Sequence, residues 1–269
     1  MSRTRGEAGT ECGVMAKKTQ GRDKRQMQED EYAFPYHYIP HFTKKGRVAL
    51  SRRLSWGLEY LCYQRHVFET VQALDPSSVL DVGCGDGYFL GSLADTIPVR
   101  VGVDLSDRSI AFAKAFHPEC RFLAADVEAV EGCFDVVISI EVLEHIPETE
   151  VSAFFRAIGD RLAENGTAII GVPTTVVPLA RKHYRHYTLD LFEEQLSQSN
   201  AGLRVVSHDY VFKKPCWYGA FKWLFNNHLF SLEIRPLVAL AWKRILSTHR
   251  CADRANGCHL VVCLRKHVA

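Results

Sequence analysis

The sequence predicts an α/β protein built around one doubly wound sheet. Short apolar runs alternate with helix-length segments along most of the chain, which is typical of parallel strands with helices on both faces of a sheet. The composition, 47% hydrophobic and 24% charged over 269 residues, suits one large domain with an appendage. It excludes collagen-like, coiled-coil and wholly disordered chains.

The N-terminal part differs in composition from the rest. Residues 1–31 carry mixed charge and few large apolar groups, so we expect a disordered tail. They lack the apolar core of a secretory signal, and no apolar run reaches the roughly 20 residues that cross a bilayer, so we expect a cytoplasmic protein. Residues 32–76 are predicted to form an aromatic and basic extension that ends in a helix, because apolar residues recur at helical spacing over 54–74. The domain proper is predicted at 77–269.

Seven strands and four helices are predicted in this domain. The first six strands are expected at residues 79–82, 99–103, 121–124, 134–138, 167–172 and 203–207. The helices between them are expected at residues 88–95, 107–116, 148–162 and 189–198. The last strand, residues 258–264, follows a turn at Asn256-Gly257 and is therefore expected to return antiparallel.

One segment interrupts the alternation of strands and helices. Residues 212–250, termed the insert, separate the sixth and seventh strands and are too many for a simple connection. We predict a helical insert, for which two roles stay open. It is either a helical pair packed on the sheet or a lid over the substrate that touches a membrane interface through its aromatic and basic residues.

The nine cysteines do not indicate a disulfide framework. Their number is odd and several stand inside apolar runs, so they are expected to be small buried hydrophobes in a reducing compartment. A zinc cluster would draw on Cys251, Cys258, His259 and Cys263. The spacing of these residues argues against it, because it lacks the paired C-x-x-C pattern, and residues 259–264 also fit a buried strand.

The charge is unevenly distributed along the chain. Between Gln72 and Tyr210 the sequence has 10 basic and 21 acidic residues, out of 33 and 31 in the whole chain. The flanks therefore carry the basic excess. Such an asymmetry favours an anionic partner, either nucleic acid or an anionic lipid surface, at the flanks, although scattered surface lysines explain it equally well.

The sharpest motif is a glycine turn after the first strand. Residues 79–90 read VLDVGCGDGYFL, an apolar strand that runs into glycines at every second position and then into a helix. Glycines let the backbone turn sharply and approach a ligand without a Cβ in the way. The spacing matches neither the G-x-G-x-x-G of dinucleotide binding nor a P-loop.

Acidic residues end the next two strands. Asp104 ends the second strand, where a carboxylate can accept both hydroxyls of a ribose, and Asp126 follows the third, where it could accept from an adenine amino group. Ligands of open α/β sheets bind at the carboxyl ends of strands near the switch point. The glycine turn, both acids and the end of the fourth strand are therefore expected to share one pocket.

Residues 79–266 resemble the motifs of class I S-adenosylmethionine-dependent methyltransferases. The resemblance implies a Rossmann-like seven-stranded doubly wound sheet with an antiparallel last strand, and S-adenosylmethionine as cofactor. Three glycines would line the methionine part of the cofactor: Gly83, Gly85 and Gly87. Asp81 would hold the turn and Asp104 the ribose, while Asp126 and the Val127 amide would read the adenine. The insert departs from the family pattern.

Two polar clusters follow the fourth and fifth strands. Glu141, Glu144 and His145 stand at i, i+3 and i+4 and would share one side of a helical turn. The segment KHYRHYT at residues 182–188 would lie above the same crevice. Methyl transfer to a hydroxyl requires alignment and removal of a proton, so His145 or His183 is a candidate general base, with Glu144 beside it.

The E-x-x-E-H pattern with a downstream histidine resembles two groups of enzymes, the metal-dependent small-RNA 3′-terminal 2′-O-methyltransferases and the ubiquinone-pathway O-methyltransferases. The RNA enzymes have H-x-F-E-W-T, whereas residues 183–188 lack the acid and the tryptophan. The RNA resemblance implies Mg²⁺ or Mn²⁺ ligands at Glu141, Glu144, His145 and His183. Such an ion would lower the pKa of the acceptor hydroxyl, and two imidazoles favour a transition metal. Methyltransferases without a metal also carry E-x-L-E-H here, with the histidine as a packing residue or base.

The sequence thus predicts a methyltransferase that O-methylates a small, lipid-linked or glycan-linked metabolite. A metal-dependent RNA 2′-O-methyltransferase is the alternative, and a non-catalytic cofactor-binding scaffold is a third hypothesis. Arg181, Lys182 and Arg185 would hold an anionic acceptor, and Thr188 would cap the helix that begins at Leu189. Peripheral membrane contact is expected, if anywhere, through the insert.

Overall fold

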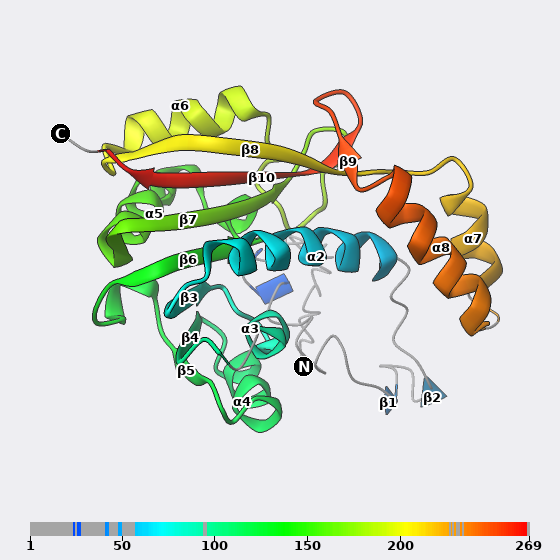
Figure 1. Cartoon of the computed structure of the whole chain (residues 1–269), viewed down its shortest axis with the longest axis horizontal. Coiled ribbons are helices and arrows are strands. Elements are labelled where there is room, and N and C mark those ends of the chain that lie inside the picture. Colours follow the sequence, from blue (N-terminus) through cyan, green and yellow to red (C-terminus); the bar gives the residue numbers. More distant parts are fainter. Residues whose placement is uncertain are drawn as a thin grey trace, which may run out of the picture.

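The computed structural model describes residues 24, 26–27, 41–42, 48–49, 57–93, 96–225, 227, 229, 232 and 234–267. Their main feature is an eight-stranded sheet with helices on both faces (Figure 1). A separate two-stranded sheet pairs β1 (His41–Phe42) with β2 (Val48–Ala49). Most of the expected N-terminal tail and aromatic extension lies outside the described residues.

The large sheet has the order β5-β4-β3-β6-β7-β10-β8-β9. Its strands are β3 (Ser78–Val82), β4 (Val99–Asp104), β5 (Arg121–Ala124), β6 (Phe134–Ile140), β7 (Leu162–Pro173), β8 (Leu203–Lys213), β9 (Cys251–Ala252) and β10 (Gly257–Lys266). The first five pair in parallel, whereas β10 is antiparallel to both β7 and β8. The seven predicted strands and the antiparallel last strand are confirmed. The short edge strand β9, antiparallel to β8, is an addition.

Helices connect the strands close to the predicted places. They are α2 (Gly57–Leu74), α3 (Tyr88–Ser92), α4 (Asp107–Phe116), α5 (Glu148–Arg161) and α6 (Leu189–Ser199). The Thr188 hydroxyl accepts from the Leu191 amide, so the predicted cap of α6 is confirmed. The expected helix at residues 88–95 is shorter, because Leu93 already has an extended conformation.

The core lies on both faces of the sheet, because alternate residues of one strand point to opposite sides. Val79 belongs to a cluster with α2 and α4, while the next residue, Leu80, belongs to a cluster with α5 and α6. Both residues are fully buried. The central strands are therefore covered by helices on either side, which explains their nearly continuous apolar sequence.

The insert forms two helices, α7 (Tyr218–Phe225) and α8 (Arg235–Thr248), as predicted. Tyr218 and Ile245 are buried in the same cluster as α2, so the pair packs against that side of the molecule. α7 follows β8, and β8 runs parallel to β7 because both are antiparallel to β10. The insert therefore leaves the sheet at the edge where the central parallel strands end.

Among the described residues, no helix is both long and apolar enough to cross a membrane.

Candidate active site

A cleft of about 680 Å³ opens at the carboxyl ends of β3, β4, β5 and β6. Six of the residues predicted to bind the cofactor or to act on the acceptor line it: Gly83, Asp104, Asp126, Val127, Glu141 and His145. The other predicted residues, Asp81, Gly85, Gly87, Glu144 and His183, do not line it. The sheet topology therefore brings strand ends from distant parts of the sequence to one cleft.

The glycine turn between β3 and α3 adopts a backbone that side chains would disturb. Gly83, Gly85 and Gly87 all have φ between 55° and 78°. A Cβ on Gly83 would lie 2.2 Å from Val142 Cγ2, and one on Gly87 would lie 2.7 Å from Phe122 Cζ. All three positions need glycine for conformation, and Gly83 and Gly87 need it also for space.

Asp104 connects the glycine turn to the end of β4. Its carboxylate accepts from the Gly85 amide at 3.0 Å and from the Ser106 amide at 2.8 Å. Because Asp104 also lines the cleft, one carboxylate both orders the turn and faces the cleft.

Asp126 begins a short 3₁₀ turn, Val127–Ala129, at the end of β5. Its Oδ1 accepts from the Val127 amide at 2.6 Å. The carboxylate and amide predicted to read an adenine therefore lie side by side in the cleft. Because the Asp126 carboxylate and the Val127 amide are hydrogen-bonded to each other, an adenine would have to replace that hydrogen bond.

Asp81 lies on β3 beneath the turn and is only 3% exposed. Burial, and then the negative charge of Asp104, raise the pKa of Asp81 to about 7. Asp81 therefore lies behind the glycine turn rather than in the cleft.

Glu144, His145 and His183 converge beside the cleft. Their ligand atoms all lie within 4.8 Å of one another, and the rings of His145 and His183 meet edge to face at 4.6 Å. Glu144 is fully buried, and neither of its carboxylate oxygens accepts a hydrogen bond from the described chain. Burial, and then the charge of Glu141, raise its pKa well above the usual range. The group is thus a buried acid facing two imidazoles.

A hydrogen-bond chain sets the tautomer of His183. His186 Nδ1 lies 2.9 Å from the Val177 carbonyl oxygen, so it carries the proton and donates. In neutral His186, Nε2 is then the acceptor for His183 Nδ1, 2.7 Å away. This leaves the Nε2 lone pair of His183 for a proton or a cation. Burial lowers the pKa of His183 to about 3 and that of His145 to about 4, so both rings are neutral near pH 7.

Glu141 is directed elsewhere, although its residue type and spacing suggested membership of the same group. It has φ of 57°, a strained value for a side-chain-bearing residue, and its Oε1 lies 3.0 Å from His259 Nδ1. The other ring nitrogen of His259 lies 3.4 Å from Glu59 Oε1 on α2. Glu141 is thus tied to β10 and lines the cleft, whereas Glu144 is buried beside it with His145 and His183.

His259 was not expected to belong to the site. Its ring stacks on Tyr63 at 4.4 Å and 10°. Burial lowers its pKa, but the charges and hydrogen bonds of Glu141 and Glu59 outweigh burial and raise it to about 9. His259 is therefore an imidazolium held between two carboxylates. The residue lies far from the motifs in sequence, so only the pairing of β10 with β7 could reveal the contact.

The basic residues of segment 182–188 have different surroundings. Lys182 lines the cleft, whereas the Arg185 guanidinium pairs with Glu148 at 3.0 Å. Within the expected N-terminal tail, Lys24 and Gln26 are described and also line the cleft. No sequence pattern pointed to these two residues.

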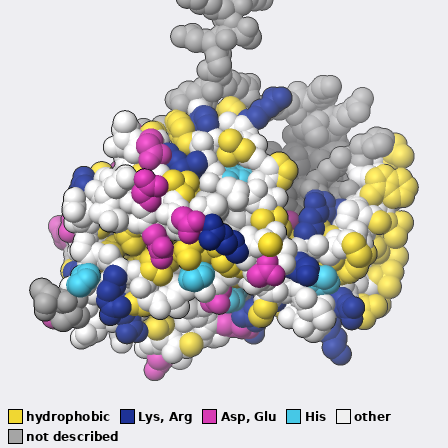
Figure 2. Space-filling view, turned by 90° about the horizontal axis from the view of Figure 1, so that it is seen from above, with side chains coloured by type: hydrophobic (Ala, Val, Ile, Leu, Met, Phe, Trp, Pro, Cys, Tyr) yellow, Lys and Arg dark blue, Asp and Glu magenta, His cyan; other side chains and the backbone are white. Residues whose placement is uncertain are grey.

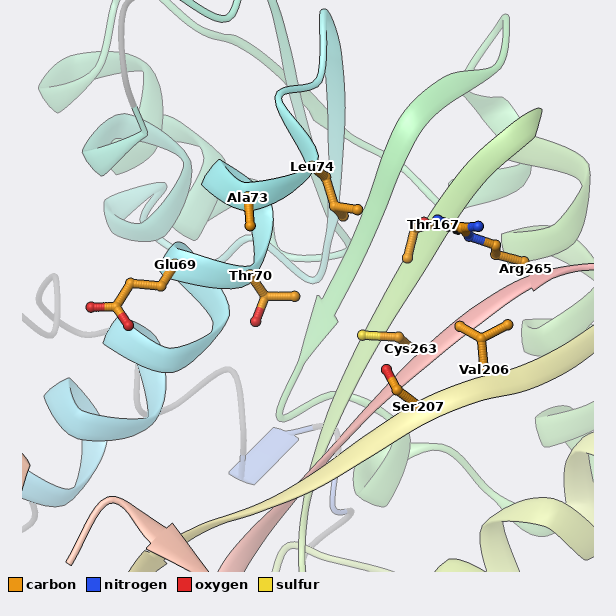
Figure 3. A pocket seen from close by; sticks show the side chains of 9 residues that line it. All are labelled: Glu69, Thr70, Ala73, Leu74, Thr167, Val206, Ser207, Cys263 and Arg265. Atoms are coloured by element: carbon orange, nitrogen blue, oxygen red, sulfur yellow. Dashed lines mark hydrogen bonds between the residues drawn. The ribbon is translucent and has the colours of Figure 1, made fainter. Parts of the chain in front are cut away.

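A second hollow, of about 400 Å³, lies between α2 and strands β7, β8 and β10 (Figure 3). Its lining is mainly apolar, and Arg265 Nε donates to Thr167 Oγ1 across one end. Leu74 ends α2 shortly before β3 begins, and Thr167 pairs with Val136 near the start of β6, so this hollow lies toward the amino ends of the parallel strands, away from the cleft.

A family model described as "Methyltransferase domain" matches residues 58–208, more than half of the chain. The match begins in α2 and ends in β8. It therefore includes the glycine turn, the strand ends and the Glu144 group.

Curated relatives match over shorter stretches. A ubiquinone biosynthesis O-methyltransferase of Leptothrix cholodnii is 36% identical over 89 residues, which are 30% of this chain and 38% of that protein. An uncharacterized methyltransferase of Mycobacterium tuberculosis is 32% identical over 127 residues, 45% of this chain and 62% of the relative. The matches thus span less than two thirds of these relatives.

Solved structures share the fold. The methyltransferase domain of bacterial CtHen1-C superposes with a TM-score of 0.54 at 15% identity, covering 78% of this chain and 99% of that one. Magnesium protoporphyrin IX methyltransferase from Synechocystis PCC 6803 superposes with a TM-score of 0.52 at 14% identity, covering 90% and 94%. The family match, the sheet order and the glycine turn lead to one conclusion: the chain belongs to the class I S-adenosylmethionine-dependent methyltransferases.

Proposed function

We propose that the chain transfers a methyl group from S-adenosylmethionine to a hydroxyl of a small, lipid-linked or glycan-linked acceptor. The observation that carries the proposal is the group Glu144, His145 and His183, which lies beside the cofactor cleft and offers neutral nitrogens to an acceptor. The relative from Leptothrix cholodnii is named as an O-methyltransferase, which supports oxygen as the methylated atom.

The cofactor would occupy the part of the cleft below the glycine turn. Asp104 would accept from the ribose hydroxyls, and Asp126 with the Val127 amide would bind the adenine edge. The positive φ of Gly83 lets the backbone approach the methionine part. These assignments are supported by the lining of the cleft, which includes Gly83, Asp104, Asp126 and Val127.

The reaction is an in-line displacement at the methyl carbon. The acceptor oxygen forms a new bond to carbon while the carbon–sulfur bond breaks, and the electron pair of that bond stays on sulfur to give S-adenosylhomocysteine. The acceptor hydroxyl must also lose its proton. His145 lines the cleft and would take it, and His183 and Glu144 lie within reach behind His145. Closeness and alignment of donor and acceptor would supply the remaining rate enhancement.

The same group also fits a divalent cation. The buried Glu144 carboxylate lacks hydrogen-bond donors within the described chain, and a cation would satisfy it. Glu144, His145 and His183 would be the ligands, and His186 would orient His183 from behind. Glu141 is not part of this cluster. When bound, Mg²⁺ or Mn²⁺ would lower the pKa of the acceptor hydroxyl. This observation favours, as second candidate, a metal-dependent 2′-O-methyltransferase of RNA.

One experiment separates these functions. The chain is incubated with labelled S-adenosylmethionine and a cell extract, with or without EDTA, and the label is divided into RNA, lipid and small-molecule fractions. Label in the lipid or small-molecule fraction that EDTA does not change supports the first proposal with His145 as base. Label in RNA that EDTA abolishes supports the second.

Variants sharpen the same test. Glu144→Gln should abolish transfer in either case, whereas Glu164→Gln, an exposed acid on β7, should leave it intact. If Mn²⁺ added after EDTA restores wild-type transfer, the ion is required. Binding of S-adenosylhomocysteine without any transfer would identify a cofactor-binding scaffold and overturn both proposals.

A further inference from the structure

The insert exposes an unusual number of large apolar side chains. Leu229 is 78% exposed, Trp223 68% and Leu240 64%. Further exposed apolar residues lie in the same stretch: Leu224, Leu232, Ile234 and Leu237. They occupy the end of α7, the connection and the start of α8, at the end of the molecule where hydrophobic side chains gather in Figure 2. Monomeric proteins rarely expose so many large apolar side chains within one region without a partner.

The helix α8 has both buried residues, which pack on the core, and exposed apolar residues. Ala241 and Ile245, one helical turn apart, are buried against the rest of the molecule. Leu237 and Leu240 are both exposed and lie on one face, at i and i+3. Leu240 is therefore not part of the packing that holds the helix in place, whereas Leu237, one turn before Ala241, lies at its margin.

The insert is also strongly basic. It contains seven lysine and arginine residues against one acidic residue. Five of the cations are exposed: Lys213, Lys214, Arg235, Lys243 and Arg244. This combination of exposed apolar and basic side chains is typical of helices that lie in the interface of an anionic bilayer.

We propose that the apolar and basic surface of α7 and α8 docks on an anionic membrane. The basic charge, together with the exposed apolar residues, favours an anionic membrane over other partners. A two-fold contact with a second copy would bring equal basic patches together, which is unfavourable. Nucleic acid would use the cations but leave the exposed tryptophan and leucines without apolar contact.

The docked surface would lie on the acceptor side of the molecule, because the insert leaves the sheet at the same edge as the cleft. The Glu59 amide donates to the Tyr218 hydroxyl of α7 at 3.2 Å, and the Glu59 side chain pairs with His259, which holds Glu141 at the cleft. Docking would thus place the cleft near lipid headgroups. This part rests on the proposed lipid-linked acceptor, whereas the docking itself does not.

The test is flotation of the full chain with vesicles of phosphatidylcholine alone or mixed with phosphatidylglycerol. We expect recovery with the mixed vesicles, and less recovery with phosphatidylcholine alone or at high salt. The double variant Trp223→Ser, Leu240→Ser should lower the partition coefficient at least tenfold, about 1.4 kcal/mol. The matched control Val99→Ser, Phe116→Ser also removes two exposed apolar groups, but from β4 and α4, and should bind as the wild type does.

A second variant guards against misfolding. Lys243→Glu with Arg244→Glu changes only exposed residues of α8 and should also abolish binding while S-adenosylhomocysteine affinity stays unchanged. Absence of flotation with the mixed vesicles overturns the proposal. Two other results would assign the surface to another partner and overturn the proposal. One is a dimer that Leu240→Ser dissociates. The other is binding of RNA, but not of vesicles, that the charge reversal abolishes. Since vesicle binding needs no acceptor, this result is independent of the methyl-transfer assay.

Discussion

Asp104 has two tasks in one side chain, since it accepts from the Gly85 and Ser106 amides and lines the cleft. Asp104→Ala should weaken S-adenosylmethionine binding by roughly 1.5 to 3 kcal/mol, the usual value of hydrogen bonds to a charged group. Titration calorimetry measures the change. Asp107→Ala, an exposed acid in the first turn of α4, is the control and should bind normally. If both variants bind S-adenosylmethionine with equal affinity, Asp104 does not contribute to cofactor binding.

His259 offers a second test at the residue scale. Removing an imidazolium from between two carboxylates costs roughly 3 to 5 kcal/mol when the pair is fully buried. The Glu59 and Glu141 side chains are 19% and 29% exposed, so we expect a smaller loss, about 2 kcal/mol, for His259→Gln.

The pH dependence of this loss follows from the raised pKa. With a folded value of about 9 against 6.5 in the unfolded chain, the stabilisation by His259 is complete below about pH 6.5 and disappears as the pH rises through about 9. Urea unfolding of wild type and His259→Gln across this range measures it. His208→Gln, an exposed histidine on β8, should show no such change. A difference between wild type and His259→Gln that is constant with pH would contradict the paired imidazolium.

Asp81 should make the protein less stable as the pH rises. Burial, and then the charge of Asp104, raise its pKa to about 7 from 3.8, so the folded state binds a proton that the unfolded state releases. The free energy of unfolding should therefore fall between about pH 4 and pH 7, by at most about 1.4 kcal/mol per pH unit. Asp81→Asn removes this part of the pH dependence. Identical slopes for wild type and variant in urea unfolding would show that Asp81 is ionised in the folded protein.

At the scale of elements, the glycine turn combines backbone strain with close packing. Gly83→Ala must place a Cβ 2.2 Å from Val142 Cγ2 at φ of 78°. Gly132 offers a matched control, because it has φ of 87° but no atom within 4 Å of an added Cβ. Gly132→Ala should cost about 1 kcal/mol from conformation alone, and Gly83→Ala clearly more.

A double-mutant cycle tests whether the extra stability loss of Gly83→Ala over Gly132→Ala comes from the contact with Val142. Val142→Ala should recover part of the stability of Gly83→Ala but none of that of Gly132→Ala, as measured by chemical denaturation. If Gly83→Ala costs no more than Gly132→Ala, the turn is free to move away from Val142.

The elements were largely predictable from the sequence, because strands buried on both faces read as short apolar runs and helices as periodic segments. The run at residues 134–138 is an example, because it lies in β6, and so is the turn at Asn256-Gly257, because β10 begins at Gly257. Boundaries were less predictable. β8 extends to Lys213, since pairing with β10 continues beyond the apolar run.

The site was predictable only where its residues follow strand ends. Asp104 and Asp126 could be placed because parallel strands bring their carboxyl ends together. The partnership of Glu141 with His259 could not, because it depends on the register of β10 against β7. The role of His186 as partner of His183 depends likewise on ring orientation, which sequence spacing does not define.

At the scale of the whole molecule, contacts connect the two ends of the described domain. Glu59 on α2 and His259 on β10 meet behind Glu141, which lines the cleft, and Tyr218 of the insert contacts Glu59. Shortening the insert would therefore affect more than the membrane surface. Deleting residues 219–248 should lower both the unfolding temperature and the rate of methyl transfer, whereas Trp223→Ser with Leu240→Ser should change neither for an acceptor in solution. Thermal unfolding and transfer assays on both variants test this difference.

The position of β10 has a consequence for biosynthesis. It fills the gap between β7 and β8, yet the ribosome makes it after every other strand of the sheet. Until it emerges, β7 presents an open edge of buried apolar residues to whatever strand is nearby, including that of another nascent chain. Glu141 gains its imidazolium partner at the same moment as the edge is closed. Translation of this protein thus leaves the sheet unprotected and the candidate active site incomplete until β10 is added. We therefore expect a chain that stalls before Gly257 to expose apolar sheet edges to chaperones and proteases.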